Sequence, residues 1–369
     1  MRKAIKFCFK NAVLCIALLA AAVTSLIIPP DASYIGYFDF KTLTCLFCTL
    51  AVVCALRNIH IFEITAYKIV ELFHTARWAT IALVYITFIG SMVMANDMAL
   101  ITFLPLGYFV LSSTGNKKYM AFVFIMQNIA ANLGGMITPF GNPQNLYMYS
   151  YFNIPTGEFV GIMALPFFLS ITIITACCFL VGNEPLQIKE VTHDKLNIPL
   201  SIIYGVLFVF SIMIVFNFVP YYWGLIAIPV ALIILDRKAL SQVDYPLLLT
   251  FCAFFIFSGN MARIPAVNTF LGGLISRNPL LYGVASCQVI SNVPSAILLS
   301  KFTTNYPQLL VAVNIGGTGT LVSSLASLIT FREYSKYAPD DTVPYIRQFT
   351  MYNFGILLIL LIVMSIRYA

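Results

Sequence analysis

Two asparagine-bearing turns interrupt long uncharged stretches of the sequence. The first reads Ala-Asn-Asp-Met around Asn96 and Asp97, and the second reads Ser-Asn-Val-Pro from Ser291. An amide side chain both donates and accepts hydrogen bonds, so such turns could hold a small ion beside exposed helix ends. Asp97 is the only carboxylate in these segments, and a buried acid could carry a proton or bind sodium. The alternative role, for Asp97 and for the asparagines, is to cap a helix.

A glycine-containing segment occurs twice, each time within a hydrophobic stretch. The residues from Asn132 to Thr138 read Asn-Leu-Gly-Gly-Met-Ile-Thr, and those from Asn314 to Thr320 read Asn-Ile-Gly-Gly-Thr-Gly-Thr. Unwound backbone survives at membrane depth only where protein shields it or where it lines a cavity. Paired helix interruptions in two halves of a chain therefore indicate the binding site of a transporter.

The candidate site residues come from these four interruptions and the segments that follow them. None of the segments contains Lys or Arg, so an anion would be balanced by helix dipoles and a co-bound cation. Sodium could be held by the ion-coupling residues, whereas no transition metal and no cofactor is expected. The candidates for substrate binding are Asn96, Asn142, Gln144, Asn145, Ser291, Asn292, Thr318, Ser323 and Ser324. The candidates for ion coupling are Asn96, Asp97, Asn132, Gly134, Thr138, Asn292, Asn314, Gly316 and Thr320.

Composition places these segments in a membrane. Of the 369 residues, 60% are hydrophobic and 9% are charged, and the charge-free runs are long enough to cross a bilayer. The sequence therefore predicts an all-α polytopic membrane protein. The cysteines lie in or beside apolar helices, where thiols act as small hydrophobes, so disulfides are not implied. The basic N-terminus could belong to a signal peptide, but the apolar run is long and no clean cleavage site follows it.

The stretch around residues 59–76 predicts an amphipathic helix in the membrane interface. A metal site is the alternative, because Glu71 and His74 have a spacing used in helical metal bundles. However, Glu63 and Glu71 would lie about 12 Å apart along a helix, too far to close around one ion. The predicted polar stripe is His60, Glu63, Tyr67, Glu71 and His74, opposite Ile61, Ile69, Leu72 and Phe73.

Basic residues predict the orientation. We take the Asn96 and Asn292 turns as tips of re-entrant hairpins from opposite sides, and each Gly-Gly segment as the break in a helix that crosses once. Sixteen of the 21 Lys and Arg residues then lie on the cytoplasmic side with the N-terminus, and the two halves are inverted. In the alternative topology the asparagine turns only kink full spans, and Lys117 and Lys118 lie outside.

The two turns, the run from Ile137 to Asn145 and the segment from Asn314 to Leu328 resemble signatures of the ion transporter superfamily. The chain is most similar to its citrate-transporter-like group, which includes divalent-anion:sodium symporters, bacterial arsenite permeases and one class of sodium/proton antiporters. The resemblance implies two inverted repeats, a scaffold that forms a homodimer, and a transport domain that moves as an elevator. In the symporters, Ser-Asn-Thr hairpin tips contact substrate and sodium. Here only the asparagines and Ser291 match, and Asp97 resembles the Asn-Asp turn of the arsenite permeases.

We therefore expect a secondary active transporter of the inner (plasma) membrane, and not an enzyme, that moves a small carboxylate or oxyanion coupled to sodium or protons. The alternatives are a sodium/proton antiporter without an organic substrate and, more remotely, a membrane enzyme or channel. Lipid is the expected surrounding, and no nucleic acid is expected as a partner. The predicted parts are a first repeat (1–181, with an interfacial helix 59–76, a hairpin 78–112 and a broken helix 119–152), a linker and connecting helix (182–218), and a second repeat (219–369, with a hairpin 279–303 and a broken helix 305–330).

Overall fold

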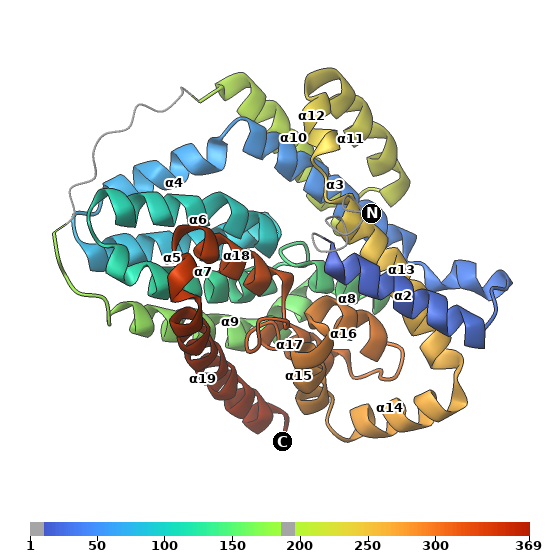
Figure 1. Cartoon of the computed structure of the whole chain (residues 1–369). Helices are drawn as coiled ribbons and strands as arrows, with labels where there is room; N and C mark the ends of the chain where they lie inside the picture. Colours follow the sequence, from blue (N-terminus) through green and yellow to red (C-terminus); the bar gives the residue numbers. More distant parts are fainter. Residues whose placement is uncertain (1–10, 186–195) are drawn as a thin grey trace.

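The computed structural model describes residues 11–185 and 196–369, and this part of the chain is built from helices (Figure 1). Seven of its helices are long and apolar enough to cross a membrane. This confirms the prediction of an all-helical polytopic membrane protein. The basic residues before position 11, the signal-peptide alternative and the charged centre of the linker all lie outside the described residues.

The helices follow one another with short connections, apart from the longer segment between α9 and α10. The first half contains α2 (Ala12–Ile27), η1 (Ala32–Tyr37), α3 (Phe40–Asn58), α4 (Ile61–Glu71), α5 (Ala76–Val93), α6 (Asn96–Ser113), η2 (Lys117–Tyr119), α7 (Met120–Gly134), η3 (Gly135–Ile137), α8 (Pro143–Tyr151) and α9 (Thr156–Cys178). After α10 (Ile198–Val215) come α11 (Tyr221–Leu235), α12 (Arg237–Ser241), α13 (Tyr245–Arg263), α14 (Pro265–Arg277), α15 (Pro279–Ile290), α16 (Asn292–Leu299), α17 (Tyr306–Ile315), α18 (Leu325–Tyr337), η4 (Pro339–Asp341) and α19 (Thr342–Tyr368).

Helices from the two halves of the chain pack against each other reciprocally. α2 packs along α13, and α11 packs along α3. In the same way α8 contacts α16 while α18 contacts α6, and α9 contacts α17 while α19 contacts α7. Figure 1 shows one of these exchanges, with blue α2 beside gold α13. The centre of the molecule is therefore built jointly by both halves, and the span that contains α7 is 89% buried.

The two helices that open the halves begin in the same way. Asp39 precedes α3, and its carboxylate accepts a hydrogen bond from the Thr42 N–H at 2.9 Å. Asp244 precedes α13, and its carboxylate accepts one from the Leu247 N–H at 3.0 Å. Each acid satisfies an N–H group that has no partner within its helix, and a negative charge at a helix N-terminus is favourable. Both aspartates therefore act as N-terminal caps.

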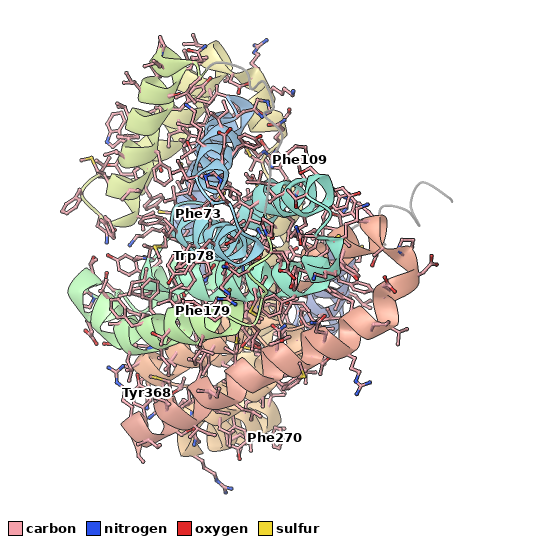
Figure 2. All side chains as sticks on the ribbon, turned by 90° about the vertical axis from the view of Figure 1, so that its left-hand side faces the viewer. Phe73, Trp78, Phe109, Phe179, Phe270 and Tyr368 are labelled. Atoms are coloured by element: carbon pink, nitrogen blue, oxygen red, sulfur yellow. The ribbon has the colours of Figure 1, made fainter. Side chains whose placement is uncertain are left out.

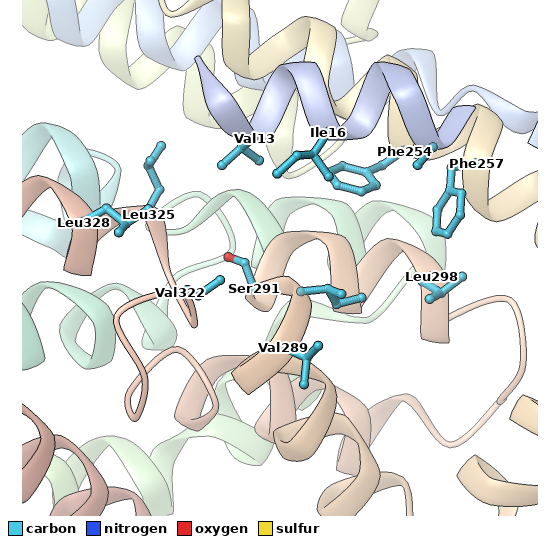
Figure 3. A pocket seen from close by; sticks show the side chains of 12 residues that line it. Val13, Ile16, Phe254, Phe257, Val289, Ser291, Leu298, Val322, Leu325 and Leu328 are labelled. Atoms are coloured by element: carbon cyan, nitrogen blue, oxygen red, sulfur yellow. The ribbon is translucent and has the colours of Figure 1, made fainter. Parts of the chain in front are cut away.

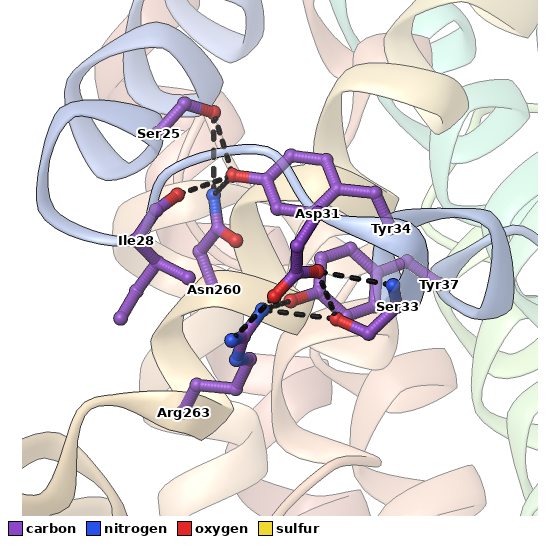
Figure 4. A network of polar contacts seen from close by, with 8 residues as sticks. All are labelled: Ser25, Ile28, Asp31, Ser33, Tyr34, Tyr37, Asn260 and Arg263. Carbon is purple, nitrogen blue, oxygen red and sulfur yellow. Dashed lines mark hydrogen bonds and ion pairs between the residues drawn. The ribbon is translucent and has the colours of Figure 1, made fainter.

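A polar network joins the segment after α2 to the end of α13 (Figure 4). Arg263 forms an ion pair with Asp31 at 2.8 Å and donates to the Tyr37 hydroxyl at 3.0 Å. The Asn260 amide donates to the Tyr34 hydroxyl at 2.9 Å. The hydrogen bond from Arg263 favours the charged carboxylate and lowers the pKa of Asp31 to about 2. The network thus ties a loop of the first half to a helix of the second.

The predicted polar stripe of the interfacial helix is wrong in part. Tyr67 is buried, and its ring lies 6.3 Å from that of Phe109 on α6. By contrast, Ile69 and Leu72 are exposed. The reason is that α4 is apolar on more than one side, so the Tyr67 face packs on α5 and α6 and the Leu72 face is left outward. The helix is also shorter than predicted.

Exposed aromatic side chains occupy the outer face near the start of α5. Trp78 and Phe179 meet edge to face with ring centroids 6.3 Å apart, and the Arg77 guanidinium lies 5.9 Å from the Phe179 ring. Figure 2 shows Phe73, Trp78 and Phe179 one below the other on this face. Trp, whose ring is amphipathic, is enriched where a membrane protein meets the headgroup level.

Candidate functional site

Both asparagine turns begin a helix. The Asn96 Oδ1 accepts a hydrogen bond from the N–H of Asp97 at 3.0 Å, and the Asn292 Oδ1 accepts one from the N–H of Val293 at 2.9 Å. Each amide oxygen thus satisfies an N–H group of the first helical turn. Ser291 precedes the second turn with a φ of 75°, a left-handed conformation that is costly for a residue with a side chain. The surrounding contacts must hold this tip in place.

The first broken helix is stabilised by one amide. Between α7 and α8 the backbone leaves the helix, and the Asn145 Nδ2 donates to the carbonyls of Gly135, Met136 and Thr138 at 3.2, 3.3 and 3.2 Å. The Thr138 hydroxyl donates to the Met92 carbonyl at 2.9 Å, which joins the break to the end of α5. The Met136 carbonyl has no other donor, whereas the carbonyls of Gly135 and Thr138 also accept from the N–H groups of Thr138 and Gly141. Asn145 therefore satisfies a carbonyl that the break frees and adds a second bond to the other two.

The second broken helix is held by a side chain that the sequence analysis missed. Gln288, on α15, donates through Nε2 to the carbonyls of Gly316 and Thr318 at 2.9 and 3.1 Å, and accepts from the Thr320 N–H at 2.9 Å. Gly319 has a φ of 122°, and a Cβ there would lie 2.1 Å from the Gln288 Oε1. The signal that could have identified Gln288 from the sequence is a glutamine within an apolar helix, three residues before an asparagine turn.

A lattice of buried amides joins the two breaks. The Asn314 Nδ2 donates to the Asn145 Oδ1 at 2.6 Å, and the Asn314 Oδ1 accepts from Asn142 and Gln144, each at 3.4 Å. The Asn142 Nδ2 also reaches the carbonyl of Asn132 at 3.2 Å. All five side chains are at most 1% exposed. Hydrogen bonds between buried side chains therefore connect the two breaks directly.

The two asparagine turns contact the broken helices. The Asn96 Nδ2 donates to the Asn132 Oδ1 at 3.2 Å. The backbone N–H of Asn292 donates to the Ser323 carbonyl at 2.9 Å, and the Ser291 hydroxyl reaches the same carbonyl at 3.3 Å. Each turn therefore contacts the break that belongs to its own half.

A small cavity, which we call the polar cavity, lies where these elements meet. Its volume is about 50 Å³, enough for a few water molecules or a small ion. The first residues of four helices, α6, α8, α16 and α18, contribute to its wall. Helix N-termini carry a partial positive charge, which favours an anion. The lining residues are Val13, Asn96, Asp97, Pro143, Gln144, Leu247, Thr250, Ser291, Asn292, Val293, Pro294 and Leu325.

Two residues that line this cavity have a side-chain oxygen that is buried without a hydrogen-bond partner. These oxygens are the Asp97 Oδ1 and the Gln144 Oε1. A buried acceptor without a partner costs free energy unless a ligand, a proton or a water satisfies it. Oxygen atoms of carboxylate and amide groups also suit a hard cation such as sodium. The cavity therefore combines the partial positive charge of helix N-termini, which favours an anion, with acceptors for a cation.

The predicted residues fall into three groups. Asn96, Asp97, Gln144, Ser291 and Asn292 share the cavity wall. Behind them, Asn132, Asn142, Asn145 and Asn314 form the amide lattice. The third group has structural roles. Four hydroxyls donate to backbone carbonyls, those of Thr138, Thr318, Thr320 and Ser323, and Ser324 caps α18. The carbonyl of Gly316 accepts from Gln288, and Gly134 packs so closely that a Cβ there would lie 2.2 Å from the Phe88 carbonyl.

The sequence analysis also did not predict a polar connection between α7 and α18. The Asn132 Nδ2 donates to the Asn128 carbonyl at 3.0 Å, the Asn128 Nδ2 reaches the Ser327 hydroxyl at 3.4 Å, and Thr330 donates to the Asn128 Oδ1 at 3.4 Å. This connection extends the lattice away from the cavity. No group of three His, Cys, Asp or Glu side chains that could hold a metal occurs in residues 11–185 and 196–369.

Comparisons with known proteins show the family to which the chain belongs. The family model described as citrate transporter matches residues 7–308. An uncharacterized transporter of Methanocaldococcus jannaschii is 31% identical over 300 residues, which cover 80% of this chain and 81% of the relative. The inner membrane protein YbiR of Escherichia coli is 30% identical over 283 residues, which cover 73% of each chain. The protein is therefore a membrane transporter that belongs to the citrate transporter family.

Proposed function

We propose that this transporter moves a small anion, a carboxylate or an oxyanion, by secondary active transport coupled to sodium or protons. The observation that carries the proposal is the convergence of four helix N-termini and Asp97 on one cavity. The N-termini supply partial positive charge for the anion. The unpartnered oxygens of Asp97 and Gln144 supply ligands for the coupling cation. Because the cation neutralises Asp97, its arrival makes the cavity more favourable for an anion.

The transport movement that we propose uses two inverted repeats. The reciprocal packing of α2 with α13 and α11 with α3 supports two equivalent halves, as does the docking of each asparagine turn onto its own broken helix. In this proposal the paired helices α5–α6 and α15–α16 and the broken helices move together as an elevator. The remaining helices form the scaffold of a homodimer, for which the outward residues of α10 and α11 offer a face.

We also place the protein in the inner (plasma) membrane with its N-terminus in the cytoplasm. The relative from Escherichia coli is named as an inner membrane protein. The orientation rests on the distribution of Lys and Arg, since basic residues accumulate on the cytoplasmic side. In this orientation Lys117 and Lys118, which precede α7, face the cytoplasm.

A sodium/proton antiporter is the second candidate. Two observations favour it: the Asp97 carboxylate has an oxygen without a partner, and the polar cavity has room for an ion more readily than for a large organic anion. In this function Asp97 alternately binds a proton and sodium, and no anion enters.

The experiment that separates the two uses purified protein in liposomes under an inward sodium gradient. Internal pH and membrane current are recorded with and without citrate, dicarboxylates and oxyanions. We expect a sodium-dependent current that requires one of the anions and disappears in Asn292→Ala. The control is Asn268→Ala, because Asn268 is exposed on α14 and donates only to the Ala262 carbonyl. A pH change that needs no anion and survives Asn292→Ala would instead establish antiport.

A further inference from the structure

A second and larger cavity adjoins the polar one. It has a volume of about 270 Å³, just below the range of about 300–1,000 Å³ found for small-molecule sites. We call it the apolar cavity. Figure 3 shows Val13 and Ile16 of α2 on one side of it, with Val289 and Ser291 at the end of α15 on the other.

The wall of the apolar cavity is hydrophobic almost throughout. α2 contributes Ile16 and Ala20, α13 contributes Phe254 and Phe257, and α16 contributes Leu298. Among its described lining residues only Ser291 carries a polar side chain. An apolar group that enters this space leaves water or lipid headgroups and gains contacts with these side chains.

The two cavities are adjacent and share part of their walls. Val13, Ser291 and Leu325 line both of them. Ser291 is also the residue that precedes the Asn292 turn, so the boundary between polar and apolar lining lies at the hairpin tip. A ligand with its head group among Asn96, Gln144 and Asn292 would have its remainder directed toward Phe254 and Leu298.

The charged groups around the two cavities limit how much negative charge the head group can carry. Of the described residues that line either cavity, none is Lys or Arg, and Asp97 is the only ionisable one. The four helix N-termini together offer at most roughly two positive charges, and less here because the first N–H groups of α6 and α16 are already bonded to the Asn96 and Asn292 side chains. A co-bound sodium ion or proton neutralises Asp97 but leaves no basic side chain to balance the three negative charges of a tricarboxylate. A single negative charge fits this environment better than the several of a tricarboxylate.

We infer that the substrate is a singly charged anion with an apolar group, such as an aliphatic or aromatic monocarboxylate. Its head group binds in the polar cavity, and its apolar group fills the apolar cavity between α2, α13 and the α15–α16 pair. This inference rests on the proposed anion transport and names the substrate class of the same site.

The test measures binding along a homologous series. Purified protein in nanodiscs with sodium is titrated with acetate, butyrate, hexanoate and octanoate, and Kd is obtained from the shift in thermal midpoint. We expect each added methylene to tighten Kd about fourfold until the cavity is full, which corresponds to about 0.8 kcal/mol per buried methylene. A series with equal affinities, or one in which citrate binds best, would overturn the inference.

A pair of variants on α2 locates the effect. Ala20→Phe fills the apolar cavity and should reduce hexanoate to the affinity of acetate without changing acetate itself. Leu19→Phe is the control, because Leu19 is 65% exposed and does not line the cavity. A chain-length dependence that Ala20→Phe leaves intact would contradict the location. If Ala20→Phe does not fold, Leu328→Phe fills the same space from α18, and the wild-type series stands on its own.

Failure of the inference and failure of the proposed function give different results. If citrate or an oxyanion binds and is transported while chain length has no effect, the anion transporter stands and the apolar substrate is wrong. If no anion of either panel binds while sodium/proton exchange persists, both are wrong. A lipid that co-purifies in amounts reduced by Ala20→Phe, together with a flat series, would identify the apolar cavity as a lipid site and also overturn the inference.

Discussion

Replacing Asn145 with leucine should destabilise the protein through the first broken helix. Leucine has a similar shape but cannot donate hydrogen bonds. In the native structure the Asn145 amide serves three carbonyls of the break and accepts from Asn314. Because Asn145 is fully buried, water cannot replace these bonds.

The magnitude follows from the carbonyls that lose their last hydrogen bond. Those of Gly135 and Thr138 also accept from the N–H groups of Thr138 and Gly141, at 3.4 and 3.3 Å, so the Met136 carbonyl is the one left without a donor. A buried polar group left without a partner costs about 1–3 kcal/mol. We therefore expect Asn145→Leu to lower the free energy of unfolding by about 1–3 kcal/mol. Asn314 keeps its bond to the Leu310 carbonyl at 2.8 Å, which limits further loss.

The assay is the thermal midpoint of the purified protein in lipid nanodiscs, with Asn353→Leu as the matched control. Asn353 is equally buried, but its amide donates only to the Phe349 carbonyl within α19. The Phe349 carbonyl also accepts the regular helical hydrogen bond, so it still has a donor when Asn353 is replaced. Equal midpoints for the two variants would refute the role assigned to Asn145.

Three other changes test separate features. Asp97→Asn should remove the pH dependence of transport in liposomes, and an unchanged dependence would exclude Asp97 as the proton carrier. Gly319→Ala should lower the thermal midpoint and reduce transport at least about tenfold, because its φ is 122° and the new Cβ meets Gln288, whereas Gly273→Ala has open space and should behave as wild type. Lys118 lowers the pKa of Glu184 from 4.5 to about 2, so the ion pair stabilises the fold above pH 4.5 and is lost as pH falls toward 2. Glu184→Gln should therefore make the thermal midpoint fall less steeply between pH 4.5 and 2 than in the wild type. An equally steep fall in both proteins would contradict this.

Much of the architecture follows from helix-breaking residues at membrane depth. The Gly-Gly segments and asparagine turns are visible in the sequence because such residues are unusual within apolar runs. In the structure the helices end and begin at them, with α6 starting at Asn96 and α16 at Asn292. The second broken helix runs further than the predicted residue 330, to Tyr337, because charge ends a hydrophobic run without ending a helix.

The contacts inside the site were less accessible to sequence reasoning. Asn145 and Gln144 are neighbours with similar side chains, yet one holds carbonyls of the backbone and the other lines the cavity. Gln288 was missed because its partners lie 28 to 32 residues away on another element. The apolar cavity arises between helices that are distant in sequence, so no local pattern predicts it.

The reciprocal packing of the two halves has a consequence for how the protein is made. α2 reaches the membrane early in synthesis, but its main partner, α13, belongs to the second half of the chain. Until α13 is inserted, the buried side of α2, with Ala17 and Ala21, must face lipid or the insertion machinery. The side of α3 that packs against α11 is likewise uncovered until α11 is inserted. Assembly of the native bundle is therefore a late event that follows insertion of most of the chain, and neither half can reach its final packing alone.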